Sequence, residues 1–400
     1  MRKRIFVTGM GIISAIGKNI AETLTSLSQS RSGLGRIKWL DTIHKDNLLV
    51  AEVGFSNEEL AVMLGLPDQE GYTRTTLLAL LAAKEAVAHA GISDFDNIPT
   101  GLISANTVGG MDKSEIFYYQ YLKDKTPNSY IATHDCADST EKVADHFGIT
   151  AFISTVSTAC SSAANAILLG ARLIQNGTLQ RVVVGGTECL TKFHINGFNS
   201  LKILDPSPCK PFDKNRAGIN LGEGAGYIVI ESEEVVGDDS RIIAELSGWG
   251  NACEAFHQTA SSPDGNGAYL AMKKALDMSG LKPSDIIYVN AHGTGTDNND
   301  VSEGHAIEKL FAPNIPFVSS TKPFTGHTTS AAGVVESIIS LLGMQNDMIF
   351  PNLNFSEQIE ELTFKPVATL MTGVTQKHVM SNSFGFGGNN TALIFSNHKS

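Results

Sequence analysis

The sequence has little of what marks secreted, membrane-spanning or nucleic-acid-binding proteins. Its 400 residues include five cysteines, at irregular spacing and with no Cys-x-x-Cys pair. This usage argues against a disulfide framework and favours a reduced, cytoplasmic protein. No apolar run reaches the ~18 residues that a membrane-spanning helix needs. The net charge of −11 does not suggest a nucleic-acid partner. We therefore expect neither membrane insertion nor nucleic-acid binding.

The sequence does contain a large apolar fraction, arranged in short alternating segments. Hydrophobic residues make up 42% of the chain, and 38 glycines permit tight turns and close backbone approaches. Apolar runs typical of strands alternate with helical stretches, which predicts an α/β protein with largely buried sheets. The predicted strands are 4–10, 101–105, 152–157, 181–186, 225–231, 241–249, 286–291, 316–319, 378–383 and 391–396. The predicted helices are 19–28, 72–90, 140–147, 161–176, 267–279, 300–311 and 329–344.

A weak internal repeat suggests that the chain consists of two similar halves. In the first half a strand leads through Cys160 into a helix of small residues, and in the second half a strand leads through His327 into a similar helix. We predict an N-terminal half, 1–235, and a C-terminal half, 236–400, related by a pseudo-twofold axis. The beginnings of the two helices, and with them Cys160 and His327, would then converge.

Cys160 is the most informative residue in the chain, because it lies where a predicted strand meets a predicted helix. A thiol at a helix N-terminus faces unpaired N–H groups and the positive end of the helix dipole, and both favour the nucleophilic thiolate. The same N–H groups can bind the oxyanion that forms when the sulfur attacks a thioester. We therefore interpret Cys160 as a nucleophile, although an isolated cysteine is more often a small buried hydrophobe.

Two histidines lie in loops rich in glycine and threonine. His292 follows an apolar strand, and Thr294 and Thr296 offer hydroxyls at alternate positions, suited to a carboxylate or amide ligand. His327 begins a predicted helix, whose dipole disfavours the imidazolium. A neutral ring there can donate a hydrogen bond to a developing oxyanion. Taken alone, His292 could also be a structural histidine.

Three further residues complete the candidate site. Lys322 and Glu336 flank His327 in the sequence and could form an ion pair, either within a site or as a structural salt bridge. Glycines stand on both sides of Phe386, so that backbone can approach a ligand closely. An N–H from this loop could be the second oxyanion donor, and the Phe386 ring could act as a mobile door. A simple tight hairpin is the alternative.

Two cofactor sites are not favoured by the sequence. A cysteine and two histidines could bind zinc, but the short paired spacings typical of such sites do not occur. The glycines of 221–226 lack both the spacing and the strand–loop–helix context of a dinucleotide-binding loop. We expect no metal ion and no redox cofactor.

Together, these motifs make the chain resemble the elongating β-ketoacyl-(acyl carrier protein) synthases of the thiolase-like superfamily. The resemblance covers essentially the whole chain. It implies a thiolase-like α/β fold in which duplicated βαβαβαββ halves form α-β-α-β-α layers. The motifs that carry it are Val7-Thr-Gly-Met-Gly, Thr158-Ala-Cys-Ser-Ser, Asn290-Ala-His-Gly-Thr-Gly-Thr, Ser320-Thr-Lys-x-x-x-Gly-His and Asn382-Ser-Phe-Gly-Phe-Gly-Gly.

The resemblance implies a role for each candidate residue. Cys160 would carry the acyl group. His292 and His327 would bind the malonyl thioester carbonyl and assist decarboxylation, while Lys322 and Glu336 would tune and support the field around them. The remaining expectations are oxyanion donors at the backbones of Cys160 and Phe386, substrate-binding residues Thr294, Thr296, Val108, Phe198 and Phe384, and carrier-protein docking residues Arg74 and Lys210.

The implied reaction is a decarboxylative Claisen condensation, in which an acyl group on Cys160 and malonyl-acyl carrier protein give β-ketoacyl-acyl carrier protein. The substrates would arrive on the phosphopantetheine arm of the carrier protein, and no other cofactor is implied. Proteins of this type are homodimers, and a heterodimer with a related subunit is a second possibility. The resemblance leaves open the acyl chain length and the choice between fatty acid and polyketide synthesis.

Several positions depart from the family pattern near the expected acyl channel. They favour a specialised polyene or polyketide pathway over housekeeping elongation. Two alternatives remain. A non-catalytic partner subunit that shapes chain length would usually lack the nucleophile, whereas Cys160 is present. A thiolase-like coenzyme A enzyme would need a second cysteine in 382–390, which has none. The departures are Ile219-Asn220, Phe324, Asn389-Asn390 and the tyrosine-rich segment 117–121.

Overall fold

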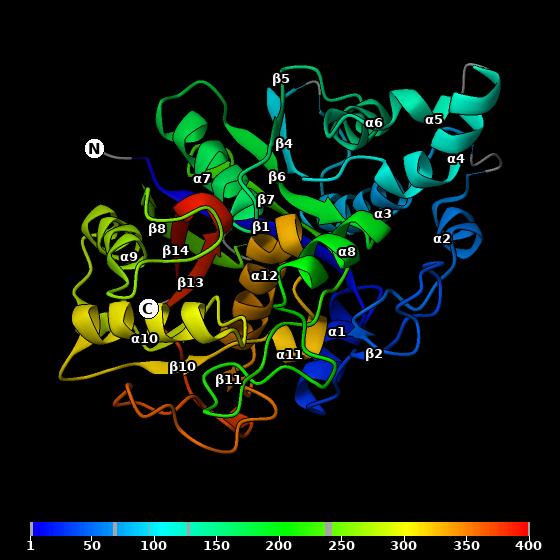
Figure 1. Cartoon of the computed structure of the whole chain (residues 1–400). Coiled ribbons are helices and arrows are strands. Elements are labelled where there is room, and N and C mark those ends of the chain that lie inside the picture. Colours follow the sequence, from blue (N-terminus) through cyan, green and yellow to red (C-terminus); the bar gives the residue numbers. More distant parts are fainter. Residues whose placement is uncertain (1–2, 67–69, 96, 126–128, 237–241, 399–400) are drawn as a thin grey trace.

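A mixed ten-stranded sheet forms the centre of the computed structural model, which describes residues 3–66, 70–95, 97–125, 129–236 and 242–398 (Figure 1). Its strands lie in the order β10-β9-β13-β14-β8-β1-β7-β6-β4-β5. Their bounds are β1 Ile5–Ser14, β4 Thr100–Ala105, β5 Phe152–Val156, β6 Arg181–Glu188, β7 Gly224–Ser232, β8 Ala244–Cys253, β9 Tyr288–Asn290, β10 Phe317–Ser319, β13 His378–Gly385 and β14 Asn389–Ser396.

The strand order repeats outward from the centre of the sheet, which confirms the predicted duplication. The first half runs β1-β7-β6-β4-β5 and the second runs β8-β14-β13-β9-β10. In each half the first two pairings are antiparallel and the last two are parallel. A short antiparallel pairing of β1 with β8, at Phe6 and Val7, joins the halves. The boundary at residues 235 and 236 stays a prediction.

Helices cover both faces of each half, and this gives the expected α-β-α-β-α layers. α7 (Ser162–Gln175) and α12 (Ala332–Gln345) contact each other and form the middle layer, where α7 touches β4 and β6 of one half and β8 and β14 of the other. On the outer faces, α3 (Arg74–His89) covers β1, β6 and β7, while α9 (Asn266–Ser279) covers β8 and β14 and carries α10 (Asp297–Phe311). α12 is buried along almost its whole length because it lies between the two halves of the sheet, in contact with β7 and β1 of one half and β13 and β9 of the other.

Every predicted strand and helix overlaps an observed one, although residue 241 of one predicted strand lies outside the described residues. The sequence patterns missed the helix α4, because none of its side chains is buried and it therefore has no apolar stripe facing a core. No helix within the described ranges is both long and apolar enough to cross a membrane. The other elements are α1 Ile20–Ser28, α2 Asn57–Leu64, α4 Met111–Asp124, α5 Ser129–Ala132, α6 Ala137–Phe147, α8 Lys192–Ser200, α11 Lys322–Thr325, β2 Gly35–Arg36, β3 Leu49–Val50, β11 Met348–Ile349, β12 Met371–Thr372 and the 3-10 turns Pro283–Asp285, Thr329–Ala331 and Phe386–Gly388.

Candidate active site

Cys160 lies in a strained turn between β5 and α7, two residues before the helix begins. Its side chain is buried, with 6% exposed. The preceding Ala159 has φ +53°, in the left-handed region that residues other than glycine rarely adopt. Ser162 stabilises this turn, because its hydroxyl donates to the Ala159 carbonyl at 2.6 Å and accepts the Thr158 N–H at 2.8 Å. The turn therefore holds the buried thiol of Cys160 in a fixed position at the start of the middle layer.

The Cys160 thiol is protonated at neutral pH. Burial raises its pKa to about 11, while Lys322, the Phe386 N–H and its own N–H lower it. The prediction that the helix N-terminus leaves a thiolate is therefore wrong for the resting protein, because the loss of hydration outweighs the groups that favour the anion. Both N–H groups nevertheless lower the pKa of the thiol, so they lie near the atom at which a thioester carbonyl would react.

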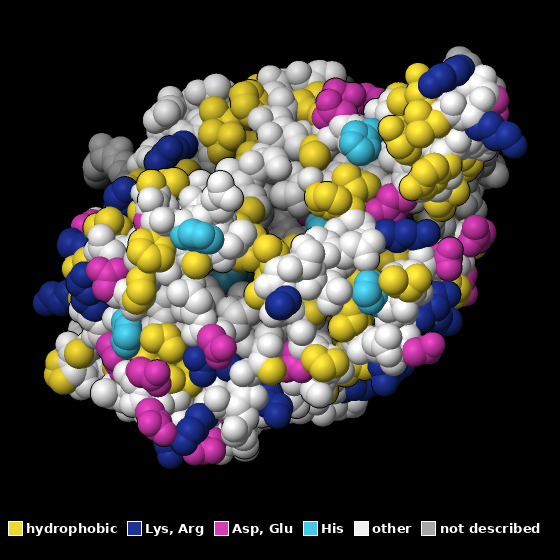
Figure 2. Space-filling model, in the orientation of Figure 1, with side chains coloured by type: hydrophobic (Ala, Val, Ile, Leu, Met, Phe, Trp, Pro, Cys, Tyr) yellow, Lys and Arg dark blue, Asp and Glu magenta, His cyan; other side chains and the backbone are white. Residues whose placement is uncertain are grey.

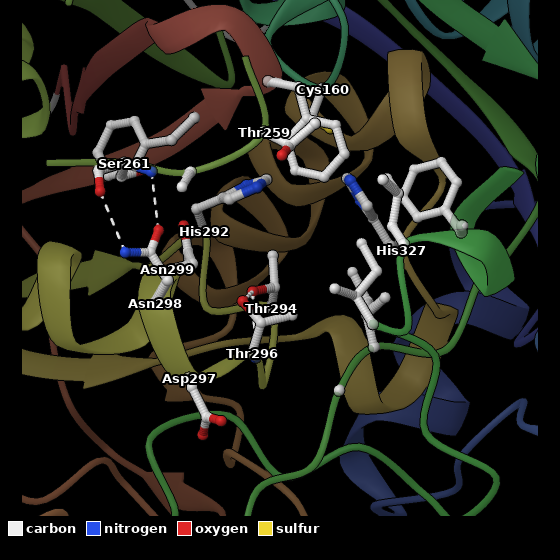
Figure 3. A pocket seen from close by; sticks show the side chains of 18 of the residues that line it. Cys160, Thr259, Ser261, His292, Thr294, Thr296, Asp297, Asn298, Asn299 and His327 are labelled. Carbon is white, nitrogen blue, oxygen red and sulfur yellow. Dashed lines mark hydrogen bonds between the residues drawn. The ribbon is translucent and has the colours of Figure 1, made fainter. Parts of the chain in front are cut away.

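Cys160, His292 and His327 meet in one place (Figure 3). The sulfur and one nitrogen from each ring lie within 4.8 Å of one another, and all three side chains are buried. The imidazole rings are 5.4 Å apart between centroids and nearly perpendicular, at 82°. His292 follows β9 and His327 lies between α11 and α12. This is the convergence of the two halves that the internal repeat predicted.

Lys322 determines which nitrogen of His292 carries the proton. Its Nζ lies 3.3 Å from Nδ1 of His292 and 2.5 Å from Oε1 of Glu336, and it also donates to the His292 carbonyl. An ammonium can only donate, so Nδ1 accepts and the ring proton sits on Nε2. Burial and then Lys322 hold the pKa of His292 well below its usual range, so the ring is neutral. Burial raises the pKa of Glu336 to about 7, and Lys322 opposes that shift.

His327 is held through its backbone. Its N–H donates to the Asn220 carbonyl at 2.8 Å, and its own carbonyl accepts the Gly222 N–H at 3.0 Å. Neither ring nitrogen has a hydrogen-bond partner among the described residues. Burial and then Lys322 hold its pKa well below the usual range. The prediction that His327 begins a helix is wrong, since α12 starts only at Ala332. Burial, rather than a helix dipole, accounts for the neutral ring.

A cavity of about 280 Å³ leads from the surface to these three side chains. Figure 2 shows it as a hollow near the middle of one face. Thr294, Thr296, Phe198 and Phe384 line it as predicted, and the two threonine hydroxyls are 2.8 Å apart. The ring of Phe386, which also lines the cavity, stacks on Phe198 with centroids 5.8 Å apart. The role of the Phe386 ring as a mobile door stays a prediction.

Four other predictions meet different outcomes. Val108 is buried but does not line the cavity, and the aromatic residues of 117–121 do not line it either. The prediction that Arg74 is a docking residue is wrong, because only 7% of Arg74 is exposed and its guanidinium forms a buried ion pair with Glu223 at 2.6 Å. Lys210 is partly exposed, and its docking role stays a prediction.

The sequence analysis missed two residues that support the site. Glu303 on α10 accepts the N–H groups of His292 at 2.9 Å and Gly293 at 2.8 Å, and so fixes the loop that carries the histidine. Burial raises the pKa of Glu303 to about 7. The sequence signal that could have identified Glu303 is an acidic residue among the residues of a predicted helix that are expected to be buried. Lys202, an exposed cation at the mouth of the cavity, had no sequence signal.

The geometry defines a class of protein. The site consists of a buried thiol beside two neutral imidazoles at the end of a cavity, in a duplicated α/β fold. This arrangement is typical of a thiolase-like enzyme that processes acyl thioesters. Comparison with known proteins agrees with this class. Family models described as β-ketoacyl synthase, N-terminal domain and C-terminal domain match residues 2–235 and 243–356. The chain belongs to the β-ketoacyl synthase family.

Relatives and solved structures match the chain over nearly its full length. It is 33% identical to 3-oxoacyl-(acyl-carrier-protein) synthase 2 of Staphylococcus aureus strain N315 over 98% of both chains, and 32% identical to the Synechocystis protein of that name over 100% of this chain and 99% of the relative. Among structures, the ishigamide ketosynthase/chain length factor has a TM-score of 0.93 at 28% identity and covers 100% of both chains. A chain of the structure described as the ketosynthase ApeO in complex with its chain length factor ApeC, from Xenorhabdus doucetiae, has a TM-score of 0.84 at 28% identity over 98% of both chains.

Proposed function

We propose that the chain catalyses the decarboxylative Claisen condensation of an acyl group, held on Cys160, with malonyl-acyl carrier protein to give β-ketoacyl-acyl carrier protein. The observation that carries the proposal is the convergence of Cys160, His292 and His327 within 4.8 Å in a buried cavity. The relatives named 3-oxoacyl-(acyl-carrier-protein) synthase 2 support the same reaction.

Acyl transfer to Cys160 comes first and needs a base, because the thiol is protonated. His292 is not that base, since Lys322 occupies its Nδ1 and its Nε2 already carries the proton. His327 has a free ring nitrogen, which takes the thiol proton as the sulfur attacks the acyl thioester. The N–H groups of Cys160 and Phe386 hold the oxyanion. The carbon–sulfur bond to the carrier arm then breaks, and the leaving thiolate takes the proton back from His327.

Malonyl thioester then enters the same cavity. Its carbonyl oxygen accepts hydrogen bonds from Nε2–H of His292 and from the neutral ring of His327. These donors stabilise the enolate that forms when the bond to the carboxylate breaks and CO₂ leaves. The enolate carbon attacks the acyl-Cys160 carbonyl, the carbon–sulfur bond breaks, and the Cys160 thiolate is reprotonated from solvent. Losing one such donor costs ~10²–10³ in rate.

The proposal uses no metal ion or redox cofactor, because the histidine side chains, the backbone N–H groups and solvent supply the protons and hydrogen bonds that the reaction needs. The sulfur and the two ring nitrogens are close enough to hold a metal ion. However, the Lys322 ammonium lies 3.3 Å from His292 Nδ1, and its charge opposes a dication there. The phosphopantetheine arm would pass the paired hydroxyls of Thr294 and Thr296 on its way to the sulfur.

The partner in this proposal is an acidic acyl carrier protein. Lys202, which is exposed and lines the cavity, and the partly exposed Lys210 offer cations for such a partner. We place the enzyme in the cytoplasm, where a reducing environment keeps a catalytic thiol free.

The test is incubation of the purified protein with an acyl-acyl carrier protein, followed by malonyl-acyl carrier protein. We expect one acyl adduct on Cys160 by mass spectrometry, then β-ketoacyl-acyl carrier protein, with neither formed by Cys160→Ala. An adduct on another residue, or condensation by Cys160→Ala, would overturn the proposal. A panel of acyl chains in the same assay identifies the preferred substrate.

A second candidate concerns the assembly in which this chain works. Both structures reported above at 28% identity are described as pairs of a ketosynthase with a chain length factor. This favours a polyene or polyketide heterodimer in which the present chain, with its cysteine and two histidines, is the catalytic subunit. β5 lies at the edge of the sheet with Ile153 42% exposed, so it has an unpaired edge for another subunit. Native mass spectrometry of the chain alone decides this: an active homodimer would contradict the heterodimer.

A further inference from the structure

We infer that three asparagine side chains, Asn165, Asn251 and Asn389, position the two oxyanion donors of the proposed reaction. They come from α7, β8 and the first residue of β14, which lie side by side where the middle layer meets the second half of the sheet (Figure 1). The inference rests on the proposed function and names positioning residues for it.

The three amides form one cluster with a defined polarity. Oδ1 of Asn389 accepts from Nδ2 of Asn165 at 2.8 Å and from Nδ2 of Asn251 at 2.9 Å. Nδ2 of Asn251 also lies 2.9 Å from Oδ1 of Asn165 and from the Thr391 hydroxyl, so its two hydrogens are shared among three acceptors. In these bonds Asn389 is only an acceptor and Asn251 only a donor. Substitutions that keep or reverse these roles can therefore separate the cluster's polarity from its size.

The cluster joins the nucleophile turn to the loop of Phe386. The hydroxyl of Ser161, the neighbour of Cys160, lies 3.0 Å from Oδ1 of Asn389 and 2.8 Å from the Thr158 carbonyl, so its one proton is shared between these two acceptors. Asn165 reaches the other side of the turn, where its Nδ2 donates to the Thr158 hydroxyl at 2.9 Å. Asn389 directly follows the turn Phe386–Gly388. Both sides of the strained turn at Ala159 are thus tied to the segment that carries the second N–H donor.

Close packing shows that the two donor segments depend on each other's position. A Cβ atom added at Gly385 would lie 2.9 Å from the Thr158 carbonyl oxygen and 3.2 Å from the Cys160 nitrogen. An oxyanion hole works only when its donors keep a fixed separation, about 3 Å from the developing charge. Because its two donors lie far apart in the sequence, contacts between the segments must set that separation, and the amide cluster makes such contacts.

Within the part of the chain that the structure describes, the cluster makes no hydrogen bond to His292 or His327, which lie on other loops. Disturbing it should therefore slow the steps that form an oxyanion at Cys160 and spare malonyl decarboxylation, which depends on the histidines. A merely structural role would lower both activities together.

The test compares Asn389→Leu with Asn389→Asp in the full-length protein. Asn389→Leu removes the acceptor at similar size, and we expect Cys160 acylation by a simple acyl thioester to slow by ~10- to 100-fold, within the range for a misplaced oxyanion donor. Malonyl decarboxylation should stay within about twofold. Asn389→Asp keeps the acceptor and should acylate at close to the wild-type rate. Asn251→Asp places acceptors face to face and should behave like Asn389→Leu.

The inference would be overturned if Cys160 of the Asn389→Leu variant were acylated at the wild-type rate. It would also be overturned if Asn389→Leu and Asn251→Asp both lost acylation and decarboxylation in parallel. The simple thioester separates this result from the reaction proposed above. If the unmodified protein acylates Cys160 but forms no condensation product, the proposed function alone fails. If its Cys160 is not acylated at all, both fail.

Discussion

The Nζ atom of Lys322 lies 3.3 Å from Nδ1 of His292, so one buried ammonium fixes the tautomer of a neighbouring imidazole. The same ammonium is 2.5 Å from Oε1 of Glu336. It also helps to hold the pKa of His327 well below its usual range, after burial. Lys322 thus touches no substrate in this account, but it fixes His292 as a donor and helps to keep His327 neutral.

Replacing Lys322 should change the pH dependence of Cys160 acylation. Lys322→Met removes a positive charge that opposes protonation of His327, so the pKa of His327 should rise. His327 must be neutral to accept the thiol proton, and activity should therefore fall at a higher pH than in the wild type as the solution is acidified. The measurement is the acylation rate between about pH 5 and pH 8. Lys322→Arg, which keeps the charge, is the control, and identical profiles for wild type and Lys322→Met would contradict the account.

The buried pair of Lys322 and Glu336 should be coupled in stability. Glu336→Leu leaves a fully buried ammonium without its acid and should cost about 3–5 kcal/mol. The double variant Lys322→Met/Glu336→Leu removes both charges and should be more stable than Glu336→Leu alone, while remaining impaired in catalysis. Urea unfolding of the two variants measures this difference. A double variant less stable than Glu336→Leu would show that the charges are not coupled as the contacts indicate.

Arg74 should matter for folding and not for carrier binding. Its Nε and Nη2 donate to the Glu223 carboxylate at distances from 2.6 to 3.0 Å, so Arg74→Met leaves that buried acid unpaired. We expect a loss of about 3–5 kcal/mol in unfolding free energy. Lys202→Ala and Lys210→Ala should instead weaken the affinity for acyl carrier protein, most clearly at low salt. Carrier binding that falls in Arg74→Met at unchanged stability would contradict this assignment.

The sequence identified the site where local chain features carry the chemistry. Cys160, His292 and His327 stand in glycine-, serine- and threonine-rich loops next to apolar strands, and the repeat between the halves predicted that Cys160 and His327 would converge. The order of the elements was readable for the same reason, because strand and helix periods are local properties.

Burial could not be read in this way, since it depends on segments distant in the sequence. From the sequence, Arg74 resembled a surface cation. Its burial follows from its ion pair with Glu223, which lies 149 residues away in the sequence. Glu303 was missed because its partners are backbone N–H groups of another loop. For Cys160, the favourable groups were predicted correctly, but the loss of hydration that outweighs them in the resting protein was not.

The most direct test of the account is the variant Cys160→Gln, assayed with malonyl-acyl carrier protein in the presence and absence of an acyl-acyl carrier protein. The side chain at residue 160 is needed to hold the acyl group, whereas decarboxylation depends on His292 and His327. The account predicts that the variant forms no β-ketoacyl product and still releases CO₂ from malonyl-acyl carrier protein. Formation of β-ketoacyl product by Cys160→Gln would contradict it.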